Sequence, residues 1–160
     1  MGYKVTKANG PAPTTAKNFQ TFEDLEVYKA ARELRKAMYS ISRCLPELEK
    51  YDLGRQIRRA AVSLTNNMAE GRGRFHYPDQ MRFFLHSRGF LEELVDDLNI
   101  CSDENYLSAE ETENLKEHAR GVLILLNGYL RHLRDRSNGV RETDEKDSED
   151  LDELDDLVCL

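Results

Sequence analysis

Apolar residues recur every three or four positions along most of the chain, and this period constrains the fold more than any other feature. Its first run is Leu25, Ala31, Leu34, Met38, Ile41 and Leu45. Because an α-helix has about 3.6 residues per turn, such a run lies on one face of a helix and marks that face for burial. Thr21 and Asp24 resemble a capping box at the start of this helix, and Pro46 ends it.

Three more helices with the same period follow. We expect the second to begin at an N-cap, Asp52, and to end at Gly71, where Gly71-Arg72-Gly73-Arg74 makes a turn. The third opens at Tyr77-Pro78-Asp79, because proline suits the first turn of a helix. The fourth begins with a capping box, Ser108 and Glu111, and ends at Ser137-Asn138-Gly139. The three core stripes are Ile57, Ala60, Leu64 and Met68; Phe84, Ser87, Leu91, Leu94 or Val95, and Leu98; and Leu115, Ala119, Val122, Leu126, Tyr129 or Leu130, and Leu133.

These patterns predict an all-α fold. Short connectors between long helices imply antiparallel neighbours, so the expected architecture is an antiparallel up-down-up-down four-helix bundle over residues 21–137. A flexible N-terminal lead, residues 1–20, precedes the bundle, since that stretch is polar, contains proline and shows no period. Residues 138–160 form an acidic tail, which we expect to be disordered.

The charge of the chain is distributed unevenly. The net charge is −7, but residues 137–160 alone hold ten acidic and two basic side chains, a balance of −8. Within 54–90, by contrast, seven arginines stand against Glu70 and Asp79, a balance of +5. The sequence therefore combines a near-neutral body with a basic middle and an acidic tail.

The arginines of the basic middle have two interpretations. Charged side chains on a helix often do no more than solvate an exposed face. Alternatively, they form a phosphate-binding surface, with Phe75, His76 and Tyr77 close enough to stack on bases. The residues alone leave both interpretations open. The candidates for nucleic-acid binding are Arg55, Arg58, Arg72, Arg74, Arg82 and Arg88.

A line of polar residues follows the second helix at helical spacing and is joined by one residue of the third helix. We call it the polar seam, and its members are Gln56, Arg59, Ser63, Asn67, Glu70 and Glu93. In a structural interpretation these groups bond to one another inside the bundle or across a subunit contact, since a buried charge must be paired. The alternative makes Glu70 and Glu93 ligands or acid–base groups. We favour the structural interpretation, because the pKa values of carboxylates are perturbed in structural ion-pair networks as well as in active sites.

The sequence carries no signature of catalysis. Di-iron sites in four-helix bundles use Glu-x-x-His pairs, and none occurs in this sequence. The four histidines lie on different segments without metal-ligand spacing, and neither a phosphate-binding loop after a strand nor a Ser/His/Asp pattern is present. We therefore expect a protein that is not an enzyme and uses no cofactor and no metal ion.

The cysteines and the apolar runs point to a compartment. Cys44, Cys101 and Cys159 are far apart and odd in number, which is typical of reduced intracellular thiols. The N-terminus has no apolar signal core, and the longest apolar run, Val122–Leu126, is too short to cross a bilayer. We expect a cytoplasmic protein with no membrane contact.

Three segments of the chain resemble a known family: LEVYKAARELRKAMY, ELEKYDLGRQIRRAAVSLTNNMAEGRGR and FFLHSRGFLEELVDDL. They are similar to the four helix bundle proteins, also called 23S rRNA intervening sequence proteins because members are encoded in insertions within bacterial 23S rRNA genes. The most specific marker is a Ser-x-x-x-Asn-x-x-Glu-Gly pattern, here Ser63, Asn67, Glu70 and Gly71, and Gly89 belongs to a second matching block.

The resemblance has implications for assembly and binding. The family is similar to the accessory protein of diversity-generating retroelements, a pentameric barrel that binds nucleic acid and a reverse transcriptase. The resemblance therefore implies a homopentamer of four-helix bundles without an assigned activity. It also implies RNA or DNA as a partner.

Two functions remain as alternatives. In the first, the protein is a non-catalytic homo-oligomeric scaffold that binds nucleic acid through its arginines, and removal of residues 140–160 strengthens the binding. In the second, it is an adaptor whose acidic tail recruits a basic protein partner, such as a reverse transcriptase or nuclease. The docking residues of the tail would be Leu151, Leu154 and Leu157, an apolar face that folds against its partner.

Overall fold

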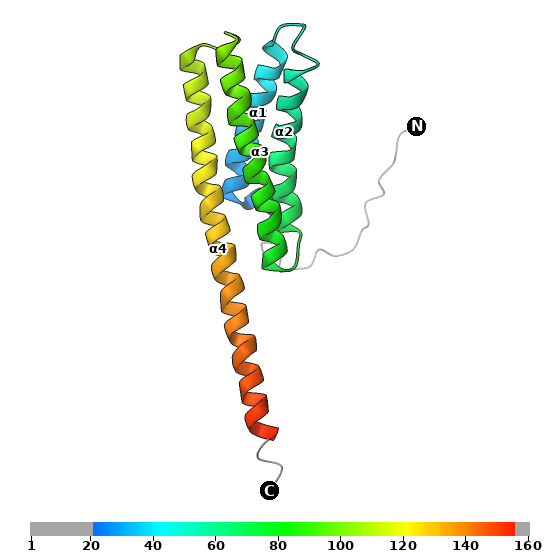
Figure 1. Cartoon of the computed structure of the whole chain (residues 1–160), viewed down its shortest axis with the longest axis vertical. Coiled ribbons are helices and arrows are strands. Elements are labelled where there is room, and N and C mark those ends of the chain that lie inside the picture. Colours follow the sequence, from blue (N-terminus) through cyan, green and yellow to red (C-terminus); the bar gives the residue numbers. More distant parts are fainter. Residues whose placement is uncertain (1–20, 156–160) are drawn as a thin grey trace, which may run out of the picture.

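The structure, a computed structural model, describes the backbone of residues 21–155 and the side chains through residue 139. A 3₁₀-helix, η1 (Phe22–Asp24), precedes four α-helices: α1 (Glu26–Cys44), α2 (Leu53–Arg72), α3 (Tyr77–Asp103) and α4 (Ala109–Asp155). Figure 1 shows the four helices side by side with alternating directions. The all-α, up-down-up-down bundle predicted from the sequence is confirmed. The N-terminal lead and Leu157 lie outside the described residues.

The core lies between the four helices and is made of the predicted stripes. Neighbouring helices pack in order, α1 with α2, α2 with α3 and α3 with α4, and α1 also packs against α4. The buried stripe residues include Ala31, Leu34 and Met38 of α1; Ile57, Ala60, Leu64 and Met68 of α2; Phe84, Leu91, Leu94 and Leu98 of α3; and Val122, Leu126 and Leu133 of α4. Ser87, a polar member of the α3 stripe, donates from Oγ to the Leu64 carbonyl at 2.9 Å, so its burial leaves no orphan hydroxyl.

The predicted caps are present, with two differences. The box of Thr21 and Asp24 forms, but it caps η1, and α1 begins after an extended residue, Leu25. Asp52 occupies the N-cap position of α2, although its side chain makes no capping hydrogen bond. The box of Ser108 and Glu111 forms as predicted, with a hydrogen bond in each direction.

Gly71 has a different task from the predicted one. Helix α2 does not end there but runs through Arg72, and its C-cap, Gly73, has a right-handed backbone with φ −77°. A Cβ at residue 71 would lie 2.9 Å from the Cβ of Phe83 on α3. The glycine is therefore required by the close approach of α3 rather than by a left-handed turn.

The predicted end of the last helix is wrong. Helix α4 passes through Ser137-Asn138-Gly139 without a break and continues to Asp155, well past the other three helices in Figure 1. A glycine ends a helix by adopting positive φ, and no glycine of the described residues has one. Ser137 is still buried, which shows that packing extends to this point. The boundary drawn between bundle and tail at residue 138 thus falls inside a continuous helix.

Candidate functional site

The polar seam joins α2 to α3 through one ion pair. The Nη2 atom of Arg59 lies 2.6 Å from Oε1 of Glu93. The side chain of Arg59 is 63% exposed and that of Glu93 is 26% exposed, so the pair sits on the outer surface of the two helices. The structure thus brings together the two seam residues that come from different helices.

The other seam residues bond within α2. The side-chain amide of Asn67 donates to the carbonyl of Ser63 at 2.8 Å, and Glu70 forms an ion pair with Arg74 at the start of the turn. Gln56 is exposed. The seam therefore faces outward, and within the described residues it does not form the interlocked network expected inside the bundle. The alternative role of Glu70 and Glu93 as ligands has no support in their contacts, since each is paired with an arginine.

Asp97 is a site that the sequence did not single out. It lies one turn after Glu93 on α3, is 1% exposed, and its Oδ2 has no hydrogen-bond partner within the described residues. Burial raises the pKa of this carboxyl to about 6, and the nearby carboxylates of Glu93 and Asp96 add to the rise, while Arg59 opposes it. The sequence does contain a signal for it, because Asp97 follows Glu93 by four residues and therefore lies on the same face of the helix.

A metal centre finds no support in the part of the chain that the structure describes, where no three His, Cys, Asp or Glu side chains gather around one point. Within residues 21–155, no helix combines the length and the apolar character that crossing a bilayer requires.

The six candidate arginines do not form one patch. Arg55 and Arg58 belong to the first turns of α2, whereas Arg72 and Arg74 lie at its other end. Seventeen residues separate Arg55 from Arg72, a distance of about 25 Å along a helix. Arg82 and Arg88 lie on α3 and are exposed. The basic middle is therefore spread over the length of two helices.

The arginines also differ in their partners. Arg58 donates to the carbonyl of Lys50 at 3.1 Å, and Arg74 pairs with Glu70. Arg55, Arg82 and Arg88 are exposed, and none of them forms an ion pair with a described residue. Their guanidinium groups are therefore open to an external anion.

Arg72 and Arg74 share a cleft with residues of α4. This end cleft has a volume of about 840 Å³ and lies where the α2–α3 turn meets α4. The described residues that line it include three arginines, two histidines, Phe75 and two tyrosines, and none of them is Asp or Glu. Its lining is Leu25, Arg72, Arg74, Phe75, His76, Tyr77, Pro78, Gln80, Tyr129, His132, Leu133, Arg136 and Ser137.

The aromatic side chains of the end cleft are held in different ways. The ring of Tyr129 packs against Phe84 with 4.5 Å between centroids, and burial raises the pKa of its hydroxyl, an effect that Arg72 opposes. Tyr77 raises the pKa of Tyr129 further, and Arg72 and both tyrosines line the cleft. Phe75, in contrast, is 90% exposed. Phe75, His76 and Tyr77 line this cleft together with Arg72 and Arg74, and their stacking on bases stays a prediction.

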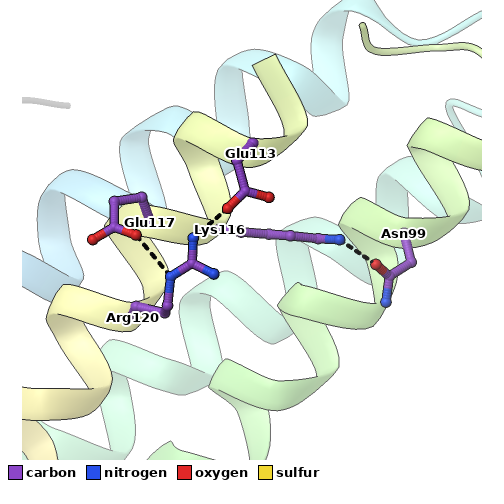
Figure 2. A network of polar contacts seen from close by, with 5 residues as sticks. All are labelled: Asn99, Glu113, Lys116, Glu117 and Arg120. Carbon is purple, nitrogen blue, oxygen red and sulfur yellow. Dashed lines mark hydrogen bonds and ion pairs between the residues drawn. The ribbon is translucent and has the colours of Figure 1, made fainter. Parts of the chain in front are cut away.

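The arginines of α4 occupy contrasting surroundings. Figure 2 shows Arg120 bound by Glu113 and Glu117 of its own helix, while Lys116 reaches across to Asn99 of α3. The charge of Arg120 is therefore neutralised locally. Arg136 lines the end cleft and forms no ion pair with a described residue. In the sequence, Arg136 and His132 have no signal of a binding site, because basic residues commonly occur near the C-terminal part of a helix.

A comparison with protein families identifies a match over most of the bundle. The model described as 23S rRNA-intervening sequence protein matches residues 23–128, well over half of the chain. The match takes in α1, α2, α3 and the first part of α4, and it stops before Tyr129, His132 and Arg136. No curated protein matches the chain at a significant level.

Proposed function

This chain belongs to the family of 23S rRNA-intervening sequence proteins, and from that premise we propose that it is a non-catalytic, cytoplasmic, homo-oligomeric scaffold that binds nucleic acid. The contact surface is formed by arginines of α2 and α3, and RNA is the first candidate ligand. The observation that carries the proposal is the state of Arg55, Arg82 and Arg88, which are exposed and without carboxylate partners within the described residues. Unpaired guanidinium groups of this kind suit phosphate, which they bind in a forked geometry.

The spread of the arginines suits a long ligand. A single small anion would touch one end of α2 and leave the other end empty. A nucleic-acid backbone presents phosphates at regular intervals, so it reaches arginines that lie about 25 Å apart on a helix. Phosphate contacts of this type position a strand without reading its sequence.

Assembly into a homo-oligomer, with the pentamer as the favoured state, is part of the proposal. It is supported by apolar side chains on the outside of α4, where Ile124 is 71% exposed and Leu125 is also exposed. Gly121 and Gly128 lie close by on α4, and a Cβ added at either would meet nothing within 4 Å. Exposed apolar side chains next to small residues favour close contact with another helix. Several copies would repeat the basic surface and strengthen binding.

A second candidate function is supported by α4. The helix carries Leu151 and Leu154 beyond the ends of the other three helices, on a stretch rich in Asp and Glu. A projecting acidic helix with leucines at helical spacing is suited to a basic protein partner. In this adaptor function the bundle would serve as the base, and the partner would be recruited at its end.

Binding of a fluorescent single-stranded RNA, followed by anisotropy at several salt concentrations, tests the scaffold. We expect affinity to fall with added salt, because each phosphate contact releases counterions. Arg88→Gln should weaken binding, while Arg32→Gln, which removes an exposed arginine of α1, should leave it unchanged. Absence of RNA binding at low salt would overturn the proposal. Capture of the same protein partner in pull-downs with and without the acidic segment would count against the adaptor.

A further inference from the structure

The end cleft combines segments that the proposed nucleic-acid surface does not. Its α2 side contributes Arg72, and its α4 side contributes Tyr129, His132 and Arg136, which lie beyond the part of the chain that the family model matches. About 840 Å³ is within the range of pockets that hold small organic ligands. The cleft is therefore a candidate site in its own right.

The charge of the lining favours a dianion. Among the residues whose side chains the structure describes, Arg72 and Arg136 form no ion pair and no Asp or Glu lines the cleft. Arg74 is different, because it pairs with Glu70 and its guanidinium lies 4.7 Å from the centre of the Phe83 ring. Two guanidinium groups that no described carboxylate neutralises match a phosphate monoester, which carries close to two negative charges at neutral pH.

The aromatic side chains favour a flat group next to that phosphate. Tyr129 is half-buried and packs against Phe84, and Tyr77 lines the same cleft. Phe75 is 90% exposed at the same cleft, and its ring meets that of His76 edge to face, with 5.1 Å between centroids. Any of the nucleobases can stack on such rings, because each base has a flat aromatic face. Inorganic phosphate alone would leave this aromatic surface unused.

We infer that the end cleft binds a nucleoside monophosphate unit, with its phosphate at Arg72 and Arg136 and its base against Tyr77 and Phe75. The unit is either a free nucleotide or the phosphorylated terminal residue of a single strand. The inference does not depend on the proposed scaffold function, because a free nucleotide would bind without any longer nucleic acid.

Calorimetric titration of the full-length protein with AMP, adenosine and inorganic phosphate tests the cleft. We expect AMP to bind at least tenfold more tightly than either fragment, since it uses both parts of the site. Arg136→Gln should weaken AMP binding about tenfold, the usual effect of losing a hydrogen bond to a charged group. Arg131→Gln is the matched control, because Arg131 is an exposed arginine of the same helix that does not line the cleft. Circular dichroism confirms that both variants are folded.

A second arm separates the two ligand sources. Short single-stranded RNAs with a 5′-phosphate or a 5′-hydroxyl are compared by anisotropy. A preference for the 5′-phosphate that Arg136→Gln removes would identify the ligand as a strand end. An effect of Arg136→Gln on AMP alone would identify it as a free nucleotide.

The outcomes also separate this inference from the scaffold function. Equal AMP affinity in Arg136→Gln and Arg131→Gln, or equal binding of AMP and inorganic phosphate, would overturn the inference even if RNA still binds in a salt-dependent way. AMP binding that depends on Arg136, without any RNA binding, would support the cleft and overturn the scaffold.

Discussion

Arg59 on α2 and Glu93 on α3 form an ion pair that links two neighbouring helices on their outer surface, with 2.6 Å between Nη2 and Oε1. Both groups also act on Asp97, one turn further along α3. Glu93 raises the pKa of the Asp97 carboxyl, whereas Arg59 lowers it. The ion pair on the outer surface of the bundle therefore influences the protonation of Asp97, which is buried beneath that surface.

The ion pair itself should contribute little to stability. Arg59 is mostly exposed, and water screens its attraction to Glu93. A double-mutant cycle with Arg59→Gln and Glu93→Gln, measured by urea unfolding, should give a coupling free energy of less than about 1 kcal/mol. A coupling above about 2 kcal/mol would mean that the pair is shielded from solvent, as in a subunit contact.

Asp97 should make the free energy of unfolding depend on pH. Its pKa is about 6 in the folded protein and lies near 3.8 when the chain is unfolded, so the folded state holds the proton more tightly. Stability from this group is present below the unfolded pKa and is lost as the pH rises from about 4 to about 6. The loss should be on the order of 3 kcal/mol.

Asp97→Asn tests that pH dependence, because the amide does not ionise. Relative to the natural protein, the variant should gain stability between pH 4 and pH 7, when both are measured by urea unfolding. Glu92→Gln, which neutralises an exposed carboxylate on α3, is the control. A stability difference between Asp97→Asn and the natural protein that stays constant over this pH range would contradict the prediction.

Gly71→Ala should destabilise the bundle. The added methyl group would lie 2.9 Å from the Cβ of Phe83, so α2 and α3 would have to move apart where the chain turns. We expect a loss of about 1–3 kcal/mol in the free energy of unfolding.

Gly89→Ala is the matched control for Gly71→Ala. A Cβ at residue 89 would meet nothing within 4 Å, and alanine is the better helix former. The substitution should therefore stabilise a single chain by about 0.5–1 kcal/mol. Light scattering of the same variant reports on assembly, since a loss of oligomer would place Gly89 in a subunit contact. Equal destabilisation by both substitutions would show that the approach of α3 at Gly71 is not what requires glycine.

Cys44 and Cys101 should differ strongly in reactivity. Cys44 is exposed, while Cys101 is buried and burial raises the pKa of its thiol to about 11. Only the thiolate reacts with iodoacetamide, so Cys44 should be modified faster by on the order of a hundredfold or more. Peptide mapping by mass spectrometry, after a timed reaction at pH 8, measures the two rates. Similar rates would indicate that the end of α3 opens readily.

The periodic stripes were sufficient to predict the bundle, because burial of an apolar face depends on spacing within one helix. The Arg59–Glu93 ion pair could also be anticipated, since both residues belong to the polar seam identified in the sequence. Gly71 was misread, because the need for glycine there comes from Phe83 on another helix. The wrong end of α4 has a similar origin. Serine, asparagine and glycine favour a stop locally, but Ser137 is itself buried in the bundle.

The end cleft could not be predicted because it depends on which helix ends meet. Arg72 and Arg136 are 64 residues apart, and they share a cleft only because α4 runs down past the α2–α3 turn. That meeting is set by the lengths and directions of three helices. No local sequence pattern indicates which helix ends meet. The arginines of the basic middle were expected to form one surface because the sequence likewise does not show how far apart they lie in space.

The continuation of α4 has a consequence for how its residues move. Helix ends fray, and the last turn opens far more often than the interior. Arg136 lies 19 residues before the end of α4 at Asp155, so it is held inside the helix rather than at a loose terminus. In a chain truncated after residue 139, Arg136 would lie in the last turn of α4, and fraying of that turn would make Arg136 mobile. Replacing the acidic residues by neutral ones, without shortening the helix, therefore separates the effect of the segment's charge from its effect on the rigidity of α4.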